Sequence, residues 1–172
     1  MAIREVVKIP ENILRRKAHK VATFDRDFQV LVEDMIETMR AEPGVGIAAP
    51  QVNVSLQLIV VEYPEDDQVE DAKPRLYVVA NPEIVESTDE TEIGIEGCLS
   101  VPELVGEVER TTKVVVRGLN RFGKKQKIIA NGWLARIFQH EIDHVNGILF
   151  VDRASRVWKP EAEVPGDEII AE

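Results

Sequence analysis

The stretch from residue 55 to 130 contains one short β-branched segment after another, with no helical pattern between them. The candidate strands cover residues 56–61, 76–80, 83–86, 92–95, 113–119 and 126–130. A doubly wound parallel sheet would need a helix between successive strands, so this order argues against that fold. Residues 120–123, Asn-Arg-Phe-Gly, form a predicted hairpin loop between the last two strands. We therefore expect an α+β fold with mostly antiparallel strands.

Two helices are predicted outside the strand region. The first follows Asp25, a predicted N-cap, and its apolar residues recur at helical spacing until the chain reaches Pro43. The second covers about residues 132–146, between Asn131 as N-cap and Gly147 as the residue that ends it. Apolar residues surround most of its circumference, a pattern typical of a helix buried among other elements. We expect the strands to pack around this central buried helix.

Charge and hydropathy limit the partners that such a chain can have. The formal net charge of −10 argues against broad nucleic-acid affinity, and we expect no sequence-specific nucleic-acid binding. The longest apolar stretches are too short to cross a bilayer, so no membrane association is expected. The N-terminus carries no basic segment followed by an apolar one, which makes a cytoplasmic protein the expectation.

The predicted buried helix carries polar residues at a spacing that suits metal chemistry. His140 and His144 are four residues apart and share one helix face, so both imidazoles can reach one cation. Glu141 follows the first histidine and can contact a metal-bound water without being a ligand itself. Only three histidines occur in the chain, and two of them lie in this turn. The pattern therefore predicts a metal site with Glu141 as general acid and base.

Two histidines leave such a site short of a third protein ligand. Cys98, the single cysteine, follows a predicted strand within Glu-Gly-Cys-Leu-Ser-Val-Pro, where Gly97 allows close backbone approach. A thiolate and two imidazoles leave a fourth tetrahedral position open, as catalytic zinc sites do. The alternative is a zinc endopeptidase with a carboxylate about twenty residues downstream, such as Glu163 or Glu168. Those two residues lie in an acidic segment broken by proline, which favours Cys98.

A glycine-rich segment, Gly-Val-Gly-Ile-Ala-Ala-Pro-Gln, covers residues 44–51. It lacks the lysine and the following helix of a phosphate-binding loop, so we reject that interpretation. Its small residues suit a backbone brought close to a substrate. The segment ends at Gln51, whose side-chain amide could donate a hydrogen bond to a developing oxyanion.

Taken together, residues 44–51, residues 96–102 and the segment Gln-His-Glu-Ile-Asp-His at 139–144 closely resemble the three signature motifs of peptide deformylases, in the same order. The resemblance extends over about residues 3–153. It implies an α+β fold and the removal of the N-formyl group from formyl-methionyl nascent peptides. It also implies that Cys98, His140 and His144 bind one divalent metal ion. Glu141 would move the proton, and Gln51 and the backbone N–H of Leu99 would hold the formyl oxygen.

The resemblance also suggests the ion, the substrate contacts and a partner. Ferrous iron is the implied cellular ion, and a Cys/His₂ site also accepts Zn²⁺, Ni²⁺ or Co²⁺. Residues expected near the methionine side chain are Gly46, Ile47, Gly97, Trp133, Arg136 and Ile137, although those on the helix suit ordinary packing equally well. Residues 1–153 are expected to form a single catalytic domain, and residues 154–172 an acidic, flexible tail. Such a tail lacks the long helix of some family members, which leaves docking on the ribosome an open question.

Overall fold

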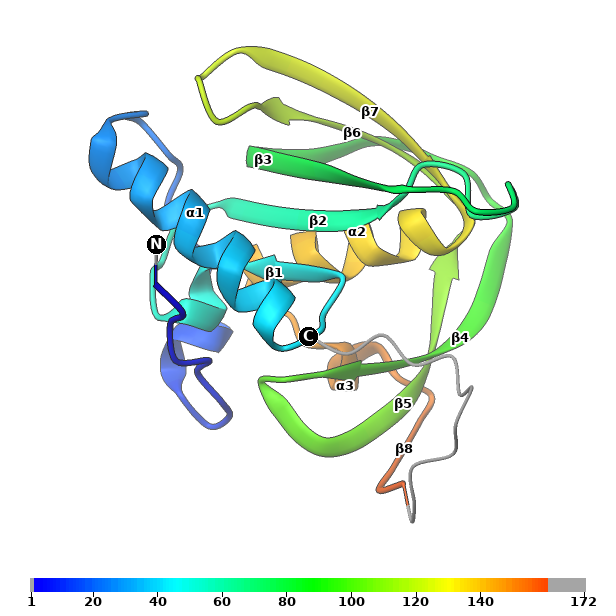
Figure 1. Ribbon diagram of the computed structural model, residues 1–172. Helices are drawn as coiled ribbons and strands as arrows, with labels where there is room; N and C mark the ends of the chain where they lie inside the picture. Colours follow the sequence, from blue (N-terminus) through cyan, green and yellow to red (C-terminus); the bar gives the residue numbers. More distant parts are fainter. Residues whose placement is uncertain (1, 161–172) are drawn as a thin grey trace.

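Two antiparallel sheets lie on either side of a long helix, α2 (Gly132–Val145), as the computed structural model shows (Figure 1). The structure describes residues 2–160. The five-stranded sheet has the order β1 (Gly46–Ala48), β2 (Leu58–Pro64), β3 (Pro74–Ser87), β6 (Lys113–Leu119) and β7 (Lys125–Asn131). The three-stranded sheet has the order β4 (Thr91–Cys98), β5 (Val101–Thr111) and β8 (Arg156–Trp158). This arrangement confirms the α+β class with antiparallel strands.

One more long helix and three short ones complete the described part of the chain. They are α1 (Arg26–Ala41), α3 (Phe150–Arg153) and the 3₁₀ helices η1 (Asn12–Arg15) and η2 (Ala49–Val52). The helix α1 starts where the sequence predicts it, because the side chain of Asp25 accepts a hydrogen bond from the Phe28 N–H at 3.0 Å. Among the residues that the structure describes, no helix is both long and apolar enough to span a membrane.

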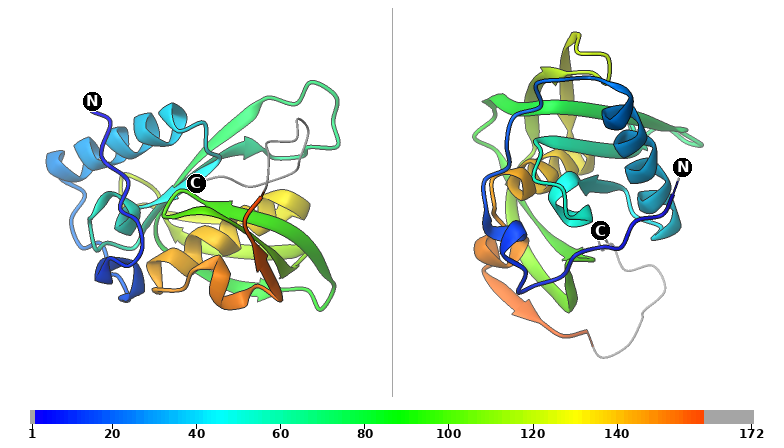
Figure 2. Two further views of the ribbon diagram at one scale, coloured as in Figure 1. Left: turned by 90° about the horizontal axis from the view of Figure 1, so that it is seen from below. Right: turned by 90° about the vertical axis from the view of Figure 1, so that its left-hand side faces the viewer.

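The continuous apolar run in strand β2 reflects a sheet that is covered on both faces. Its residues Leu58 and Val60 pack with α1, whereas Ile59 and Val61 pack with α2 on the opposite face. All four side chains are fully buried. Successive side chains of a strand point to opposite faces, so a continuous apolar run is what a doubly covered strand requires. The two further views in Figure 2 show α1 and α2 on opposite sides of this sheet.

Several strands differ from the sequence prediction. Predicted strands 76–80 and 83–86 are one strand, β3, with an irregularity between Ala80 and Glu83. There Asn81 adopts a left-handed conformation (φ 53°), and its side chain bonds the backbone of Val21. The strands β1, β5 and β8 were not predicted. In β5 the burial pattern is irregular, since the neighbours Val105 and Gly106 are both buried, and its Pro102 and Gly106 are residues that strands usually avoid.

The C-terminal part of the described chain enters the second sheet. The strand β8 pairs with β5, placing Trp158 opposite Val105 and Arg156 opposite Glu107. The domain boundary expected at residue 153 stays a prediction. The expected acidic tail falls mainly on residues 161–172, which lie outside the described residues.

Candidate active site

One turn of α2 brings two histidines and a glutamate together in the interior. The rings of His140 and His144 lie with their centroids 5.0 Å apart, and Glu141 lies between them in the sequence. All three side chains are buried: His140 and His144 are 1% exposed and Glu141 is fully enclosed. The helix thus presents three polar side chains to the interior at the i, i+1 and i+4 positions that the sequence predicts.

The thiol of Cys98 reaches the same place from the opposite sheet. Cys98 ends β4, where the pairing with β5 shifts register, and its Sγ lies 3.5 Å from His144 Nε2. One ligand atom from each of Cys98, His140 and His144 lies within 4.8 Å of the others, and all three residues are buried. Burial raises the pKa of the Cys98 thiol, but His144 and His140 lower it to about 7. A thiolate and two imidazoles at this spacing fit a divalent transition metal.

A buried carboxylate orients the first histidine. Glu96 is fully enclosed, and His140 Nδ1 lies 2.7 Å from one of its oxygens. Arg110 donates two hydrogen bonds of 2.9 Å to Glu96, and Arg136 donates one of 2.7 Å. Burial raises the pKa of Glu96, but the bonds from His140 and Arg110 outweigh it and hold the pKa far below its usual value. A carboxylate on the outer nitrogen of a metal-binding histidine fixes the ring orientation and tautomer.

The ionic network continues beyond the carboxylate of Glu96. Arg110 also donates to Asp143 at 2.6 Å, and Asp143 accepts two bonds, of 2.7 and 2.9 Å, from Arg153 in α3. Asp143 is the residue of α2 next to His144. The network therefore joins β4, β5, α2 and α3: Glu96, Asp143, Arg110 and Arg136 are buried, and Arg153 forms its exposed end.

Gln51 approaches the site from the 3₁₀ helix η2. It is fully buried, and its Oε1 accepts the N–H of Ala48 at 2.9 Å. This bond directs the side-chain NH₂ the other way, 3.6 Å from Cys98 Sγ and 3.3 Å from Ser100 Oγ. The amide donors of Gln51 thus face the group formed by the thiol and the histidines.

Steric contact with Glu141 explains why residue 46 is a glycine. A Cβ atom on Gly46 would lie 2.5 Å from Glu141 Oε2 and 3.0 Å from its Cγ and Cδ. Real Cβ atoms do not approach other atoms so closely, so a side chain at position 46 would force the Glu141 side chain to move. The backbone of β1 and the carboxylate of Glu141 therefore lie in direct contact.

The remaining predicted residues occupy varied places. Ile47 is buried in the cluster between α1 and the sheet, and Ile137 in the cluster between the sheet and α2. The Arg136 guanidinium lies over the ring of Trp133, 5.3 Å from its centroid, and donates to the carbonyls of Val108 and Glu92. Arg136 therefore ties the second sheet to α2.

The remaining two predicted residues, Gly97 and Leu99, lie at the junction of β4 and β5. Gly97 is buried beside Cys98, and Leu99 is half-buried. Leu99 lines a cavity of about 380 Å³ together with Glu42 and the N-terminal segment. The turn thus places the backbone of Leu99 next to Cys98, at the edge of the buried group.

Known proteins share this architecture. The family model described as polypeptide deformylase matches residues 3–159. The peptide deformylase of Symbiobacterium thermophilum is 49% identical over 172 residues, which is all of this chain and 76% of the relative. The chain belongs to the peptide deformylase family. The deformylase of Desulforudis audaxviator is 44% identical over 92% of this chain and 98% of its own length.

Solved deformylase structures agree with this assignment. A crystal structure of the peptide deformylase from Legionella pneumophila is 46% identical, with a TM-score of 0.80 over 90% of this chain and 87% of that one. A Met-Ala-Ser-bound class I type b deformylase from Acinetobacter baumannii is 41% identical, with a TM-score of 0.81 over 88% and 98%. The enzyme is thus a metal-dependent hydrolase that removes the N-formyl group from nascent peptides.

Sequence reasoning missed the ionic network behind the site. Glu96 lies in one of the three motifs, but the sequence indicates no role for it, nor for Arg110 or Asp143. The available signal was a helix at 132–146 that is predicted to be buried and yet carries acidic residues, since buried carboxylates need cations as partners. The sequence nevertheless could not show which arginine supplies them.

Proposed function

We propose that this deformylase holds one divalent cation with Cys98, His140 and His144, and that Glu141 moves the proton during hydrolysis of the formyl–amide bond. The observation that supports the proposal is the buried group of three ligand atoms within 4.8 Å, one from the strand β4 and two from the helix α2. Because Nδ1 of His140 bonds Glu96, the ligand role on that ring falls to Nε2. Three protein ligands leave room for substrate or water, as catalysis requires.

Each side chain then has a distinct task. A bound cation lowers the pKa of a water molecule toward neutrality and polarises a carbonyl oxygen. Glu141 accepts a proton on its carboxylate and returns it to the leaving amine, so that the products are formate and a free α-amine. Its enclosure excludes bulk water, and the contact with Gly46 fixes the position of the carboxylate.

Two donors serve the developing oxyanion in this proposal. The NH₂ of Gln51 already faces the buried group, because Ala48 engages the other end of its amide. The backbone N–H of Leu99 lies in the turn that follows Cys98. Preorganised donors of this kind stabilise negative charge that develops only in the transition state.

The cation itself is a further part of the proposal. We propose Fe²⁺ in the cell, because the resemblance to deformylases implies it, with Zn²⁺, Ni²⁺ or Co²⁺ as ions that the same donors accept. Metal analysis of anaerobically purified enzyme, paired with formate release, tests this assignment. Zinc at full occupancy with full activity would contradict the iron proposal.

The substrate in this proposal is an extended formyl-methionyl peptide. β1 and β4 are edge strands of their sheets among the described residues, so each offers backbone to an added strand. A solved deformylase with 41% identity is described as bound to Met-Ala-Ser. A cytoplasmic location, and an encounter with such peptides at the ribosome, would suit substrates that are still being synthesised.

A pair of peptides tests the substrate assignment. Formyl-Met-Ala-Ser should be hydrolysed and acetyl-Met-Ala-Ser should not, because a site shaped around a formyl hydrogen excludes a methyl group. Rapid cleavage of an internal bond in an unformylated peptide would instead favour the zinc endopeptidase.

The endopeptidase alternative also makes a different prediction about ligands. It needs Glu163 or Glu168, so deleting residues 158–172 would abolish metal binding while Cys98→Ala would not. We expect the reverse: the deletion keeps the metal and Cys98→Ala loses it. The folded domain of residues 1–153, with a separate acidic tail, is part of the same proposal.

A further inference from the structure

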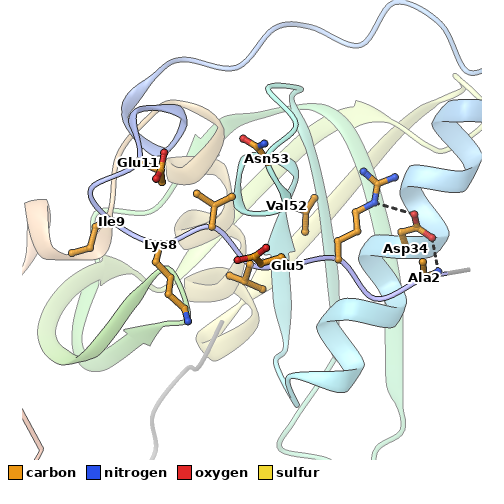
Figure 3. Close-up of a pocket in the computed structure, with 11 residues that line it drawn as sticks. Ala2, Glu5, Lys8, Ile9, Glu11, Asp34, Val52 and Asn53 are labelled. Atoms are coloured by element: carbon orange, nitrogen blue, oxygen red, sulfur yellow. Dashed lines mark hydrogen bonds and ion pairs between the residues drawn. The ribbon is translucent and has the colours of Figure 1, made fainter.

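The N-terminal segment of residues 2–9 has no regular secondary structure, yet α1 holds its first part firmly. Asp34 accepts the backbone N–H of Ala2 at 2.8 Å and the Arg4 Nε at 2.9 Å, as Figure 3 shows. Thr38, one turn further along α1, accepts the N–H of Arg4 at 2.8 Å. Asp34 is 5% exposed and Thr38 is fully buried. We call Arg4, Asp34 and Thr38 the α1 clamp.

The same segment then bonds both site segments that lie outside α2. The N–H of Val7 donates to the carbonyl of Gln51 at 2.7 Å, and the N–H of Ile9 donates to the carbonyl of Ser100 at 2.9 Å. Gln51 supplies one proposed oxyanion donor, and Ser100 follows Leu99, which supplies the other. A single short segment therefore fixes the main chain of both donor segments relative to α1.

Burying the polar side chains of Asp34 and Thr38 costs free energy. A buried carboxylate or hydroxyl loses its hydration and needs a partner in the protein. Burial raises the pKa of Asp34, but the bonds from Ala2 and Arg4 outweigh it and lower the pKa below its usual value. The partners of Asp34 and Thr38 in these bonds all belong to residues 2–4. Two buried polar residues on α1 are thus committed to holding this segment.

We propose that the α1 clamp is a positioning device for the oxyanion donors: it holds residues 2–9 in place, and these residues set the position of Gln51 relative to Leu99. This inference rests on the proposed role of Gln51. Asp34, Thr38 and Arg4 are positioning residues, because they act through the main-chain bonds of Val7 and Ile9. Small displacements of a catalytic group reduce rates strongly, by roughly 10²-fold for about 1 Å.

A double-mutant cycle separates this role from general stabilisation. Asp34→Asn keeps the side-chain volume but offers an NH₂ group to the Arg4 guanidinium, so the clamp opens. We expect kcat for formyl-Met-Ala-Ser to fall by roughly ten- to a hundredfold, with KM little changed, because the donors act in the transition state. Gln51→Ala alone should lower kcat by roughly 10²–10³-fold. In the Gln51→Ala background, Asp34→Asn should then lower kcat by a clearly smaller factor than it does in the wild type, because only the Leu99 donor is left to be displaced.

Each outcome of the cycle decides something. Equal losses from Asp34→Asn in both backgrounds, or no loss in either, would overturn the positioning role. No loss from Gln51→Ala would instead refute the proposed role of Gln51, and the positioning role with it. If Asp34→Asn fails to fold, Thr38→Val removes only the acceptor of the Arg4 N–H and carries the same cycle.

A second readout does not depend on activity. Hydrogen exchange should show faster exchange of the Val7 and Ile9 amides in Asp34→Asn, with the amides of α2 unchanged. The matched control is Glu62→Gln, which removes the Arg40–Glu62 ion pair near the C-terminal end of the same helix. Glu62→Gln should leave kcat and both amides as they are. Unchanged exchange of Val7 and Ile9 in Asp34→Asn would show that the clamp does not hold the segment.

Discussion

Replacing Glu96 by glutamine should destabilise the fold far more than removing a surface charge does. Glu96 is fully enclosed and accepts hydrogen bonds from Arg110, Arg136 and His140, whose side chains are at most 5% exposed. Glutamine keeps the volume, so no cavity forms, but it removes the negative charge from two buried guanidinium groups. Removing one partner of a buried ion pair costs about 3–5 kcal/mol. Arg110 keeps its bond to Asp143, so we expect a loss near the lower limit, ~3 kcal/mol.

Equilibrium unfolding in urea measures this loss. The protein should be metal-free, because a bound metal would itself stabilise the native state. With a urea slope of ~2 kcal/mol per molar, the midpoint should fall by ~1.5 M. Glu62→Gln is the matched control, since its pair with Arg40 is largely solvent-exposed, and such pairs contribute about 0–1 kcal/mol. If the two variants unfold at the same urea concentration, the charge of Glu96 does not stabilise the buried guanidinium groups.

Three further predictions concern the site and the clamp. Glu141→Gln should keep its metal but lose kcat by roughly 10²–10⁴-fold, and a variant without metal would make Glu141 a ligand instead. Gly46→Ala should also keep its metal and lose kcat, because its Cβ would displace the Glu141 carboxylate; a normal kcat would show that the carboxylate tolerates the shift. Asp34 has a lowered folded pKa, so its stabilising contribution is present above its unfolded pKa of ~3.9 and is lost as the pH falls through the folded value. The difference in unfolding free energy between wild type and Asp34→Asn should therefore shrink as the pH falls from about 5 to the most acidic conditions at which both proteins fold. A difference that stays constant with pH would contradict this account.

Local signals predicted much of this fold. The N-cap at Asp25 and the helical spacing of apolar residues located α1, and the crowded apolar circumference located α2. β5 escaped prediction because its inward residues include Gly106 and Arg110, and Arg110 is buried only through its carboxylate partners. The sequence alone does not show that an arginine in a strand is buried, because its burial depends on acidic partners from other elements.

The candidate site likewise combines features that the sequence predicts with features that depend on the packing of distant elements. The spacing of His140, Glu141 and His144 depends on one helical turn, so the sequence contains it completely. The position of Arg136 could not be predicted in that way. A Cβ on Gly94 would lie 2.7 Å from its guanidinium carbon, so Arg136 fits only because a distant strand has a glycine there. Pairings across 40 residues or so in the sequence depend on sheet packing, which periodicity does not reveal.

The enclosure of α2 between the two sheets has a consequence for how the enzyme loses activity. The five-stranded sheet supplies Gly46 against Glu141, and the three-stranded sheet supplies Cys98 and Glu96. If these residues have the roles proposed above, separation of either sheet from the helix removes a group that the centre needs, and a partly opened form is then inactive. Turnover during a denaturant titration should therefore follow the native population, and an activity assay serves as a direct measure of the folded fraction.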